Sequence, residues 1–440
     1  MSIGIIGGGI SGLTLAHELQ QRGQPYRLWE ATDQPGGYIR TEQTGPYLRE
    51  LGPNSLLGDD ALLTWLDTLG LMPDLVFANP VSKARYIFRR GQYRQLPATP
   101  PALLFGSYFS WKTKWAVLRE PSIRSTSPPG ETLAAFFRRR FTSELVDYAL
   151  GPFVAGIYAG DPEKLLVSET FPSLLTYEKD YGSVLKGLIK NQGKTARRQS
   201  FSFRQGVQAL PVALASRLTH ARFGCPVERL ERTQTGWTVH TPHGPETVER
   251  LVLAVPTAAA ARLLATHVPA LAQALLRVSY PPMVAVHTAY RRADVAHPLN
   301  GFGGLNPAVE NRFAAGHIWS SSLFGGRCPA NEVLFTTFVG GSQGAANAGL
   351  PPAEIRANVH AELRESFGIR AEAPVWQESF PWPHAIPQYD GSLLTVKELV
   401  NQLPDPTLHV CANWLGGVSV SDCIGNARAL GAKLSEGCGN

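Results

Sequence analysis

Three glycines near the start of the chain have the spacing of a phosphate-binding loop. Gly7, Gly9 and Gly12 form a G-x-G-x-x-G pattern that follows the apolar run Ile3–Ile6 and opens a helical pattern. The first glycine permits a tight turn, the second lets the backbone approach a pyrophosphate, and the third lets strand and helix pack closely. The helix N-terminus would face the negative charge. The expected cradle also contains Gly8, Ile10 and Ser11.

An acidic residue stands where such a loop needs one. Glu30 directly follows the run Tyr26–Trp29, which has strand character, and lies 18 residues beyond Gly12, close to the spacing that the motif requires. A carboxylate at the end of the second strand can accept hydrogen bonds from the ribose of an adenosine. The order strand, glycine turn, helix, strand and carboxylate predicts a Rossmann-like unit that binds an adenine dinucleotide.

A second glycine turn, residues 36–41, favours FAD over a nicotinamide cofactor. It lies just past the expected ribose carboxylate and carries an arginine, and a further glycine-containing segment, residues 52–55, follows. NAD(P) enzymes need no second cradle here, whereas FAD has a pyrophosphate, a ribityl chain and a ring edge to be held. Taken alone, the turn is also compatible with an ordinary surface loop. The residues expected to contact FAD from these segments are Gly37, Tyr38, Arg40, Gly52, Pro53, Asn54 and Ser55.

These segments together resemble the FAD-dependent amine oxidase superfamily. Further segments narrow the resemblance to the protoporphyrinogen oxidase family, and they occur in the family's order over essentially the whole chain. The matching segments are Gly156–Pro162, Trp319–Phe324 with Arg327 and Pro329, Thr336–Gly341, Ile386–Tyr389 and Gly417–Ile424.

The resemblance implies an α/β fold of three parts. We expect a FAD-binding, Rossmann-like domain of the amine oxidase and p-hydroxybenzoate hydroxylase type, a mixed-sheet substrate domain and a helical lobe. The FAD-binding domain is expected to comprise residues 1–78, 199–256 and 380–440. The substrate domain is expected at 79–96 and 257–379, and the helical lobe at 97–198.

The resemblance implies an oxidoreductase of haem biosynthesis. With FAD and molecular oxygen, the family oxidises a porphyrinogen to a porphyrin in three two-electron rounds, each of which forms hydrogen peroxide. The sequence offers no catalytic triad, Cys/His pair or metal-ligand pattern, so we expect no catalytic protein residue, with FAD carrying the hydride transfer. The family positions add four FAD contacts: Val227 through its backbone, and Val418, Ser419 and Val420 before the last helix.

A porphyrinogen is a large apolar disc with carboxylates on one side, so it needs an apolar slot and a cation at the mouth. By resemblance, Arg85 pairs with a propionate, a charge-assisted contact worth about 1.5–3 kcal/mol. Gly156 resembles the glycine that lets the backbone approach the macrocycle. The residues that resemble the family's sandwich around the macrocycle are Leu305, Ile318 and Phe338.

The sequence departs from the family at three places near the expected FAD. A glycine pair is replaced by Gly206-Val207, a Gly-Asn pair by Ala412-Asn413, and a Ser-Gly pair by Gly425-Asn426. We expect these departures to alter flavin affinity or ring environment without changing the cofactor.

Other functions stay open at this point. Coproporphyrinogen III, with four propionates, is an alternative substrate. Its extra carboxylates would suit Arg89, Arg90 and Arg94, although a solvated hairpin is the favoured interpretation of Arg89 and Arg90. An amine or carotenoid-type flavin oxidase is more remote, because residues 338–341 read Phe-Val-Gly-Gly where amine oxidases build an aromatic cage. A dinucleotide-binding module without enzymatic activity is disfavoured by the second cradle.

The composition limits the partners. The 440 residues carry a formal charge of +6, but the basic residues are scattered, so we expect no nucleic acid partner. Only 17% of residues are charged, which suggests a covered surface. Five cysteines without a CxxC pair indicate neither a disulfide framework nor a zinc site, and favour the reducing cytoplasm.

Residues 97–198 are the expected place for contact with a membrane. They combine Phe105, Trp111 and Trp115 with the basic run Arg138–Arg140, which suits peripheral binding to the inner face of the membrane or an ordinary packed lobe. The longest apolar run, residues 251–264, is too short to span a bilayer. A ferrochelatase that receives the porphyrin and a second copy of the chain are further candidate partners.

Overall fold

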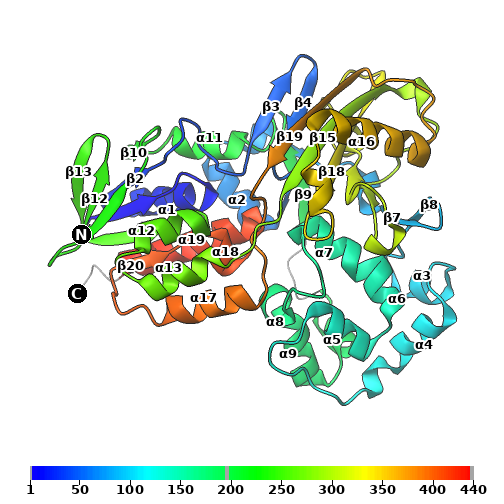
Figure 1. Cartoon of the computed structure of the whole chain (residues 1–440), viewed down its shortest axis with the longest axis horizontal. Helices are drawn as coiled ribbons and strands as arrows, with labels where there is room; N and C mark the ends of the chain where they lie inside the picture. Colours follow the sequence, from blue (N-terminus) through cyan, green and yellow to red (C-terminus); the bar gives the residue numbers. More distant parts are fainter. Residues whose placement is uncertain (1, 194–197, 437–440) are drawn as a thin grey trace.

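The computed structural model describes residues 2–193 and 198–436, which form two sheet-based parts and a helical lobe (Figure 1). The first part contains a parallel sheet of five strands in the order β10-β2-β1-β14-β20. Its central strand β1 is buried throughout, as expected of a strand covered on both faces. The strands are β1 Ile3–Ile6, β2 Tyr26–Trp29, β10 Ala221–Arg222, β14 Arg250–Leu253 and β20 Leu408–Val410.

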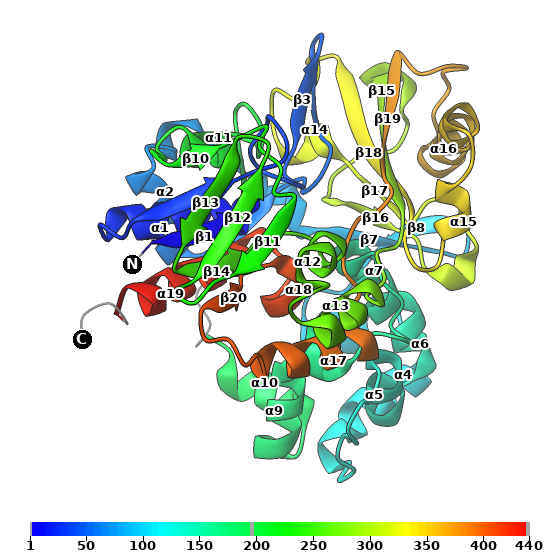
Figure 2. The ribbon, with the colours of Figure 1, turned by 60° about the vertical axis from the view of Figure 1, so that its left-hand side comes forward.

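Helices cover both faces of this parallel sheet (Figure 2). On one face, α1 (Ile10–Gln21) and α19 (Val420–Glu436) pack against each other and bury Ile5 and Val252 of the strands. This arrangement joins the first and last helices of the described chain at the sheet, and confirms the Rossmann-like architecture predicted for the dinucleotide-binding part.

The opposite face is covered by α12 (Thr257–Leu264) and α13 (Pro269–Leu276). Their apolar side chains share one core with Leu251 and Leu253 of β14. The two helices therefore pack with the parallel sheet, whereas the sequence prediction begins the substrate domain at residue 257.

The second part contains a mixed sheet of seven strands in the order β19-β15-β18-β17-β16-β7-β8. All neighbouring strands are antiparallel except β16 and β7. The strands are β7 Arg85–Arg89, β8 Gln92–Gln95, β15 Met283–Arg291, β16 Gly303–Leu305, β17 Gly316–Ile318, β18 Glu332–Gly340 and β19 Trp376–Trp382.

One face of the seven-stranded sheet is covered by α16 (Pro352–Phe367). Val286, Phe335 and Val339 point into this core with Phe367. Since side chains alternate between the faces of a strand, the residues in between point to the other face, toward the dinucleotide-binding part and the helical lobe.

The helical lobe occupies the middle of the sequence and lies beside the seven-stranded sheet (Figure 1). A buried ion-pair cluster holds it together, in which Arg140 pairs with Glu120 and Glu178. Its helices are α3 Pro100–Phe105, α4 Trp111–Arg119, α5 Leu133–Arg140, α6 Ser143–Leu145, α7 Gly151–Tyr158, α8 Val167–Thr170, α9 Pro172–Tyr181 and α10 Val184–Asn191, with a π-helical turn at Val146–Leu150.

Short elements complete the two sheet-based parts. The hairpin of β3 and β4 and the small sheet β5-β9-β6 lie where the two parts meet, and the sheet β11-β12-β13 flanks the parallel sheet. The strands are β3 Thr41–Thr44, β4 Tyr47–Glu50, β5 Leu56–Gly58, β6 Leu75–Phe77, β9 Gln199–Phe203, β11 Arg229–Arg232, β12 Trp237–Thr241 and β13 Gly244–Val248. The remaining α-helices are α2 Asp60–Thr68, α11 Ala209–Ala215, α14 Ser320–Leu323, α15 Ala345–Ala348, α17 Gly391–Asn401 and α18 Asn413–Gly416.

Candidate active site

The first glycine loop has the geometry of a pyrophosphate cradle. Gly7 has φ +112°, and a Cβ on it would lie 2.4 Å from the carbonyl oxygen of Ala254. A Cβ on Gly12 would lie 1.9 Å from the carbonyl oxygen of Gly7, so only glycine lets α1 approach β1 this closely. A Cβ on Gly9 would meet no atom within 4 Å. The loop therefore leaves open space at the glycine that should face the phosphates.

Glu30 lies at the end of β2, beside this loop. Its Oε2 accepts a hydrogen bond from the backbone N–H of Gly8, and its Oε1 accepts from the backbone and hydroxyl of Thr32 at 2.8 Å each. Because a carboxylate can accept about four hydrogen bonds, capacity remains for a ribose hydroxyl. The backbone N–H of Cys225 donates to the carbonyl of Glu30 at 2.8 Å, which brings the nearby Val227 to the expected adenosine end.

The second glycine turn lies directly against the first. The backbone N–H of Gly36 donates to the carbonyl of Gly8 at 2.9 Å. Gly37 has φ +61°, and a Cβ on it would lie 3.3 Å from the Cα of Gly9. A Cβ on Gly52 would lie 1.9 Å from the carbonyl oxygen of Tyr38, so the third glycine segment packs on the second.

Trp382, which the sequence did not indicate, connects this cradle with the seven-stranded sheet. Its ring centre lies 5.2 Å from that of Tyr38, and the guanidinium of Arg40 lies 5.8 Å from its centre. Its indole N–H donates to the carbonyl of Leu51 at 2.7 Å. The hydroxyl of Tyr38 donates to the carbonyl of His384 at 3.0 Å, and burial raises the pKa of this tyrosine to about 12. Trp382 is the last residue of β19, and a tryptophan at the end of a strand carries no periodic signal that could have revealed this role.

The segment before the last helix meets the segment that contains Ser55. The hydroxyl of Ser421 donates to the carbonyl of Leu57 in β5, which places the N-terminus of α19 beside residues 52–55. The side chain of Ser419 accepts from the backbone N–H of Asp422 at 3.0 Å. No described residue accepts from the backbone N–H groups of Val418 and Ser419. These donors at a helix N-terminus suit an electron-rich ring edge.

The four predicted substrate side chains share one face of the seven-stranded sheet. In one cross-strand row, Arg85 lies next to Gly303, which pairs with Ile318. In the adjacent row, Leu305 pairs with Gly316, which pairs with Phe338. The two rows are two positions apart along each strand. Their side chains therefore project to the same face of the sheet, opposite α16. Three of them, Leu305, Ile318 and Phe338, are only half-buried.

Gly156 of α7 faces this row of side chains. A Cβ on Gly156 would lie 3.3 Å from Cδ2 of Leu305, so the glycine gives the helix backbone its close approach to the sheet. Arg85 is exposed, and its guanidinium lies 4.3 Å from the ring centre of Phe302. No carboxylate of residues 2–193 or 198–436 forms an ion pair with Arg85. The face thus combines apolar side chains with one unpaired cation.

Arg89 and Arg90, the two arginines predicted to form a solvated hairpin, differ in exposure. Arg89 is buried, donates to Glu144 and to the carbonyl of Tyr108, and is therefore unavailable to a substrate. Arg90 is exposed at the turn with φ +53°. Arg94 lies opposite Ile87, on the face that carries Leu305, and its Nε is buried without a partner among the described residues. The prediction of a solvated hairpin was wrong for Arg89 because the helical lobe, distant in sequence, supplies its carboxylate.

The described residues contain no cluster of three or more His, Cys, Asp or Glu side chains that could hold a metal ion. Cys225, Cys328, Cys411 and Cys423 are free thiols, and Cys438 lies outside the described range.

Two of the three sites where the sequence departs from the family are closely packed or hydrogen-bonded in the structure. A Cβ on Gly206 would lie 2.2 Å from Thr41, and Asn426 donates to the carbonyl of Gly416 at 2.8 Å.

Comparison with known proteins agrees with this geometry. Residues 10–429 match the family model of flavin-containing amine oxidoreductases. The mitochondrial protoporphyrinogen oxidase of Nicotiana tabacum is 31% identical over 99% of this chain and 93% of its own length. The protoporphyrinogen oxidase of Homo sapiens is 30% identical over 77% of each chain. The chain belongs to the flavin-containing amine oxidoreductase family.

Solved structures confirm the fold. A structure from Exiguobacterium, provisionally assigned as a protoporphyrinogen oxidase, gives a TM-score of 0.81 at 20% identity and covers 99% of this chain and 98% of its own. Cyclohexylamine oxidase from Brevibacterium oxydans gives 0.72 at 18% identity, covering 100% and 99%. The predicted fold class, the flavin cofactor FAD and the assignment as an oxidoreductase are therefore confirmed, as is the resemblance to protoporphyrinogen oxidases.

Proposed function

We propose that this protein oxidises protoporphyrinogen IX to protoporphyrin IX with FAD and molecular oxygen in haem biosynthesis. The observation that carries the proposal is the shared sheet face of Arg85, Leu305, Ile318 and Phe338, with Gly156 opposite Leu305. The relatives named protoporphyrinogen oxidase support it over nearly the whole chain. Removal of six electrons takes three two-electron rounds, each of which forms one hydrogen peroxide.

The chain's residues have separate tasks in this reaction. Bound FAD supplies the two-electron acceptor, and the residues of the glycine segments and Glu30 would hold it. The half-buried side chains of the sheet would bind the apolar faces of the macrocycle, and Arg85 would pair with a propionate. We assign no catalytic acid or base.

Anaerobic reduction of the flavin tests the proposal. The purified holoenzyme is mixed without oxygen with protoporphyrinogen IX, with coproporphyrinogen III or with simple amines, and the flavin absorbance is followed. We expect rapid bleaching by protoporphyrinogen IX and none by amines. Bleaching by an amine alone would overturn the proposal. Addition of oxygen should restore the yellow colour and release porphyrin fluorescence with hydrogen peroxide.

Coproporphyrinogen III is the second candidate substrate, and Arg94 favours it. This arginine shares the sheet face of Arg85 and forms no ion pair with a described residue, so it can serve an additional carboxylate. We expect an Arg94→Gln variant to lose activity toward coproporphyrinogen selectively if this substrate is native. The ratio of kcat/KM for the two porphyrinogens in wild type and variant decides between them.

We further propose peripheral membrane contact through α3 and α4. Phe105, Trp111 and Trp115 are 88%, 76% and 63% exposed, an unusual density of apolar surface, and Lys114 lies beside them. No helix of the described residues is long and apolar enough to cross a membrane. Co-sedimentation with anionic vesicles should fall strongly in a Trp111→Ser/Trp115→Ser variant. Unchanged sedimentation of the variant would overturn the proposed membrane contact. The cytoplasmic location, a homodimer and transfer of the porphyrin to a ferrochelatase stay predictions.

A further inference from the structure

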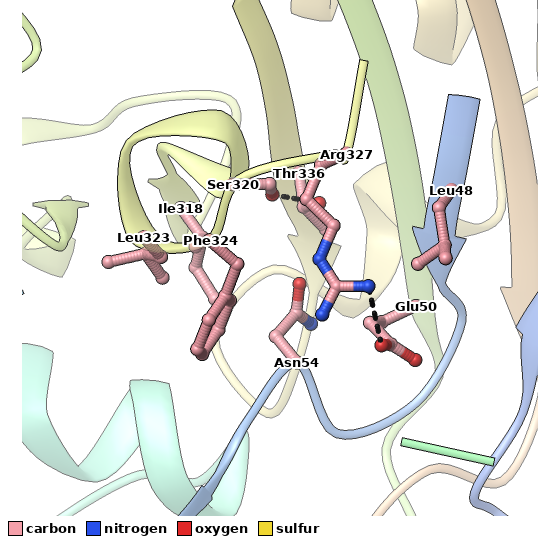
Figure 3. A pocket seen from close by; sticks show the side chains of 9 residues that line it. All are labelled: Leu48, Glu50, Asn54, Ile318, Ser320, Leu323, Phe324, Arg327 and Thr336. Carbon is pink, nitrogen blue, oxygen red and sulfur yellow. Dashed lines mark hydrogen bonds and ion pairs between the residues drawn. The ribbon is translucent and has the colours of Figure 1, made fainter. Parts of the chain in front are cut away.

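A small cavity lies between the segment that contains Asn54 and the substrate face of the seven-stranded sheet (Figure 3). It offers about 10 Å³ to a water-sized sphere, roughly the room that one water molecule needs. Ile318 and Thr336 line it from the sheet, and Glu50 and Asn54 line it from the flavin side. The cavity therefore joins residues predicted for the substrate with residues predicted for FAD.

Arg327 extends into this cavity from the loop after α14 and is only 4% exposed. Its Nη2 donates to the hydroxyl of Ser202 at 2.6 Å, and its guanidinium lies 5.2 Å from the ring centre of Phe324. Its Nη1 lies 3.6 Å from Oε1 of Glu50 and makes no hydrogen bond with any described residue. Figure 3 shows the guanidinium between Glu50 and Asn54. A buried donor without a partner is costly, so a ligand at this nitrogen is expected.

Glu50, the partner of Arg327, connects several segments around the flavin site. Its carboxylate accepts from the hydroxyl of Thr41 and from the backbone N–H of Val207, the latter at 2.9 Å. Its backbone carbonyl accepts from Nε2 of His287 at 3.0 Å. Glu50 itself is 5% exposed. The second glycine cradle and the turn at residues 206–207 thus meet at the carboxylate of Glu50, and strand β15 meets its backbone carbonyl.

We propose that Arg327 is a positioning residue for the FAD-binding segment 52–55. Paired with Glu50, it holds one water molecule in the cavity, and this water links Nη1 of Arg327 to Asn54. The hydroxyls of Ser320 and Thr336, which are 2.7 Å apart, offer the water further partners. The inference rests on one part of the proposed function, namely that segment 52–55 faces the flavin. It does not depend on which substrate is oxidised.

The physical reason for a positioning role is that the pair spans two parts of the molecule. Glu50 belongs to the β3–β4 hairpin beside the flavin cradle, whereas Arg327 follows α14 of the substrate part. The backbone N–H of Leu48 also donates to the carbonyl of Arg327 at 3.0 Å, so the loop is fixed at both ends of the residue. Removal of the guanidinium would leave Glu50 buried without its charge partner and would free Asn54.

FAD affinity and flavin circular dichroism test the inference without use of a substrate. We expect Arg327→Met to raise the dissociation constant of FAD about tenfold and to change the visible dichroism of the bound flavin. Arg327→Lys, which keeps the charge, should recover part of the loss. In the double variant Arg327→Met/Glu50→Gln, the fold-loss of FAD affinity should be clearly smaller than the product of the two single fold-losses. The reason is that the double variant no longer contains an unpaired buried carboxylate. A high-resolution crystal structure should show one water bonded to Arg327 and Asn54.

Arg140→Met is the matched control, because Arg140 is 1% exposed and paired with Glu120, but lies in the helical lobe. It should lower the unfolding midpoint and leave the FAD dissociation constant within about twofold. Equal effects of Arg327→Met and Arg140→Met on FAD binding, multiplicative effects of Arg327→Met and Glu50→Gln, or an empty cavity in the crystal would each overturn the inference. If Arg327→Met does not fold, Arg327→Lys and Glu50→Gln provide the same comparison. Failure of porphyrinogen to reduce the flavin would overturn the proposed function and leave this result unaffected.

Discussion

The predicted flavin cradle and the predicted substrate face are built from different parts of the chain. The cradle consists of backbone: glycines whose missing side chains let three loops approach one another, with Glu30 as the main polar side chain. The predicted substrate face consists of side chains that four strands bring into two rows. A backbone site should tolerate no added atoms where loops touch, whereas a side-chain site should lose affinity gradually as its members are changed.

Substitution of two glycines in the first loop should give the largest effects. In Gly12→Ala, the new Cβ would lie 1.9 Å from the carbonyl oxygen of Gly7, and we expect a loss of about 3 kcal/mol or more in unfolding free energy together with loss of FAD. In Gly9→Ala, the new Cβ meets no atom of the chain, so the stability of the apoprotein should change by less than about 1 kcal/mol. FAD affinity should nevertheless fall about a hundredfold.

Denaturant unfolding of the apoproteins and titration with FAD separate the two variants. Equal loss of apoprotein stability in both would show that Gly9 serves packing and not ligand approach. Gly9→Ala protein that binds FAD like wild type would place the pyrophosphate elsewhere.

This contrast explains what could be predicted from the sequence. The spacing of Gly7, Gly9 and Gly12 is itself the signal of the cradle, because Gly7 and Gly12 permit close backbone packing and Gly9 leaves open space for a ligand. The register that brings Arg85, Leu305, Ile318 and Phe338 together is not local, and β16 and β17 are three residues long, too short for a clear alternating pattern. Only the family resemblance located those residues.

Long-range ion pairs account for two features that sequence reasoning missed, the burial of Arg89 and the pairing of Glu50 with Arg327. The hairpin position of Arg89 suggested solvent exposure, but Glu144 of the helical lobe binds it. Glu50 ends a strand in which every residue is buried, and a buried carboxylate needs a partner, which is a usable signal. The sequence nevertheless did not reveal that the partner is Arg327, from a distant loop.

Glu50 and His287 lie where the flavin cradle meets the seven-stranded sheet. They should change the free energy of unfolding with pH in opposite directions. Burial raises the pKa of Glu50 to about 7, although Arg327 lowers it in part, and burial lowers the pKa of His287 to about 4. The native protein therefore binds an extra proton at Glu50 between about pH 4.5 and 7, so stability from this group is lost as the pH rises through this range. At His287 the unfolded chain binds the extra proton between about pH 4 and 6.5, so stability is lost as the pH falls. Each contribution is roughly 3 kcal/mol.

Single variants should reveal the two contributions, which largely cancel in the wild type. Relative to wild type, Glu50→Gln should lose stability more steeply on acidification from pH 6.5 to 4.5. His287→Gln, whose amide can still donate to the carbonyl of Glu50, should instead gain relative stability on acidification. Unfolding free energies measured at intervals of half a pH unit check this, and parallel pH profiles for all three proteins would contradict it.

Removal of the cation on the substrate face should affect substrate binding alone. Arg85→Met loses a charge-assisted contact worth about 1.5–3 kcal/mol, so KM for porphyrinogen should rise by about ten- to a hundredfold. The flavin spectrum and FAD affinity should stay unchanged, because Arg85 contacts Phe302 and not the glycine cradle. Arg90→Asn is the control in the same hairpin, since asparagine tolerates its positive φ. Similar KM values for the Arg85→Met and Arg90→Asn variants would remove Arg85 from the substrate site.

The Gly156→Ala substitution should give the smallest effects, and it should change stability and KM in different ways. This glycine lies inside α7, where alanine is favoured by up to about 1 kcal/mol, yet its Cβ would lie 3.3 Å from Cδ2 of Leu305. Because Leu305 is half-buried and can shift by a few tenths of an ångström, we expect Gly156→Ala to be slightly more stable than wild type. The same methyl group would occupy the slot, so KM for porphyrinogen should rise a few fold. Thermal unfolding and steady-state kinetics on one preparation test both changes. A more stable variant with unchanged KM would mean that the macrocycle does not reach α7, and the sheet face alone would then bind the substrate.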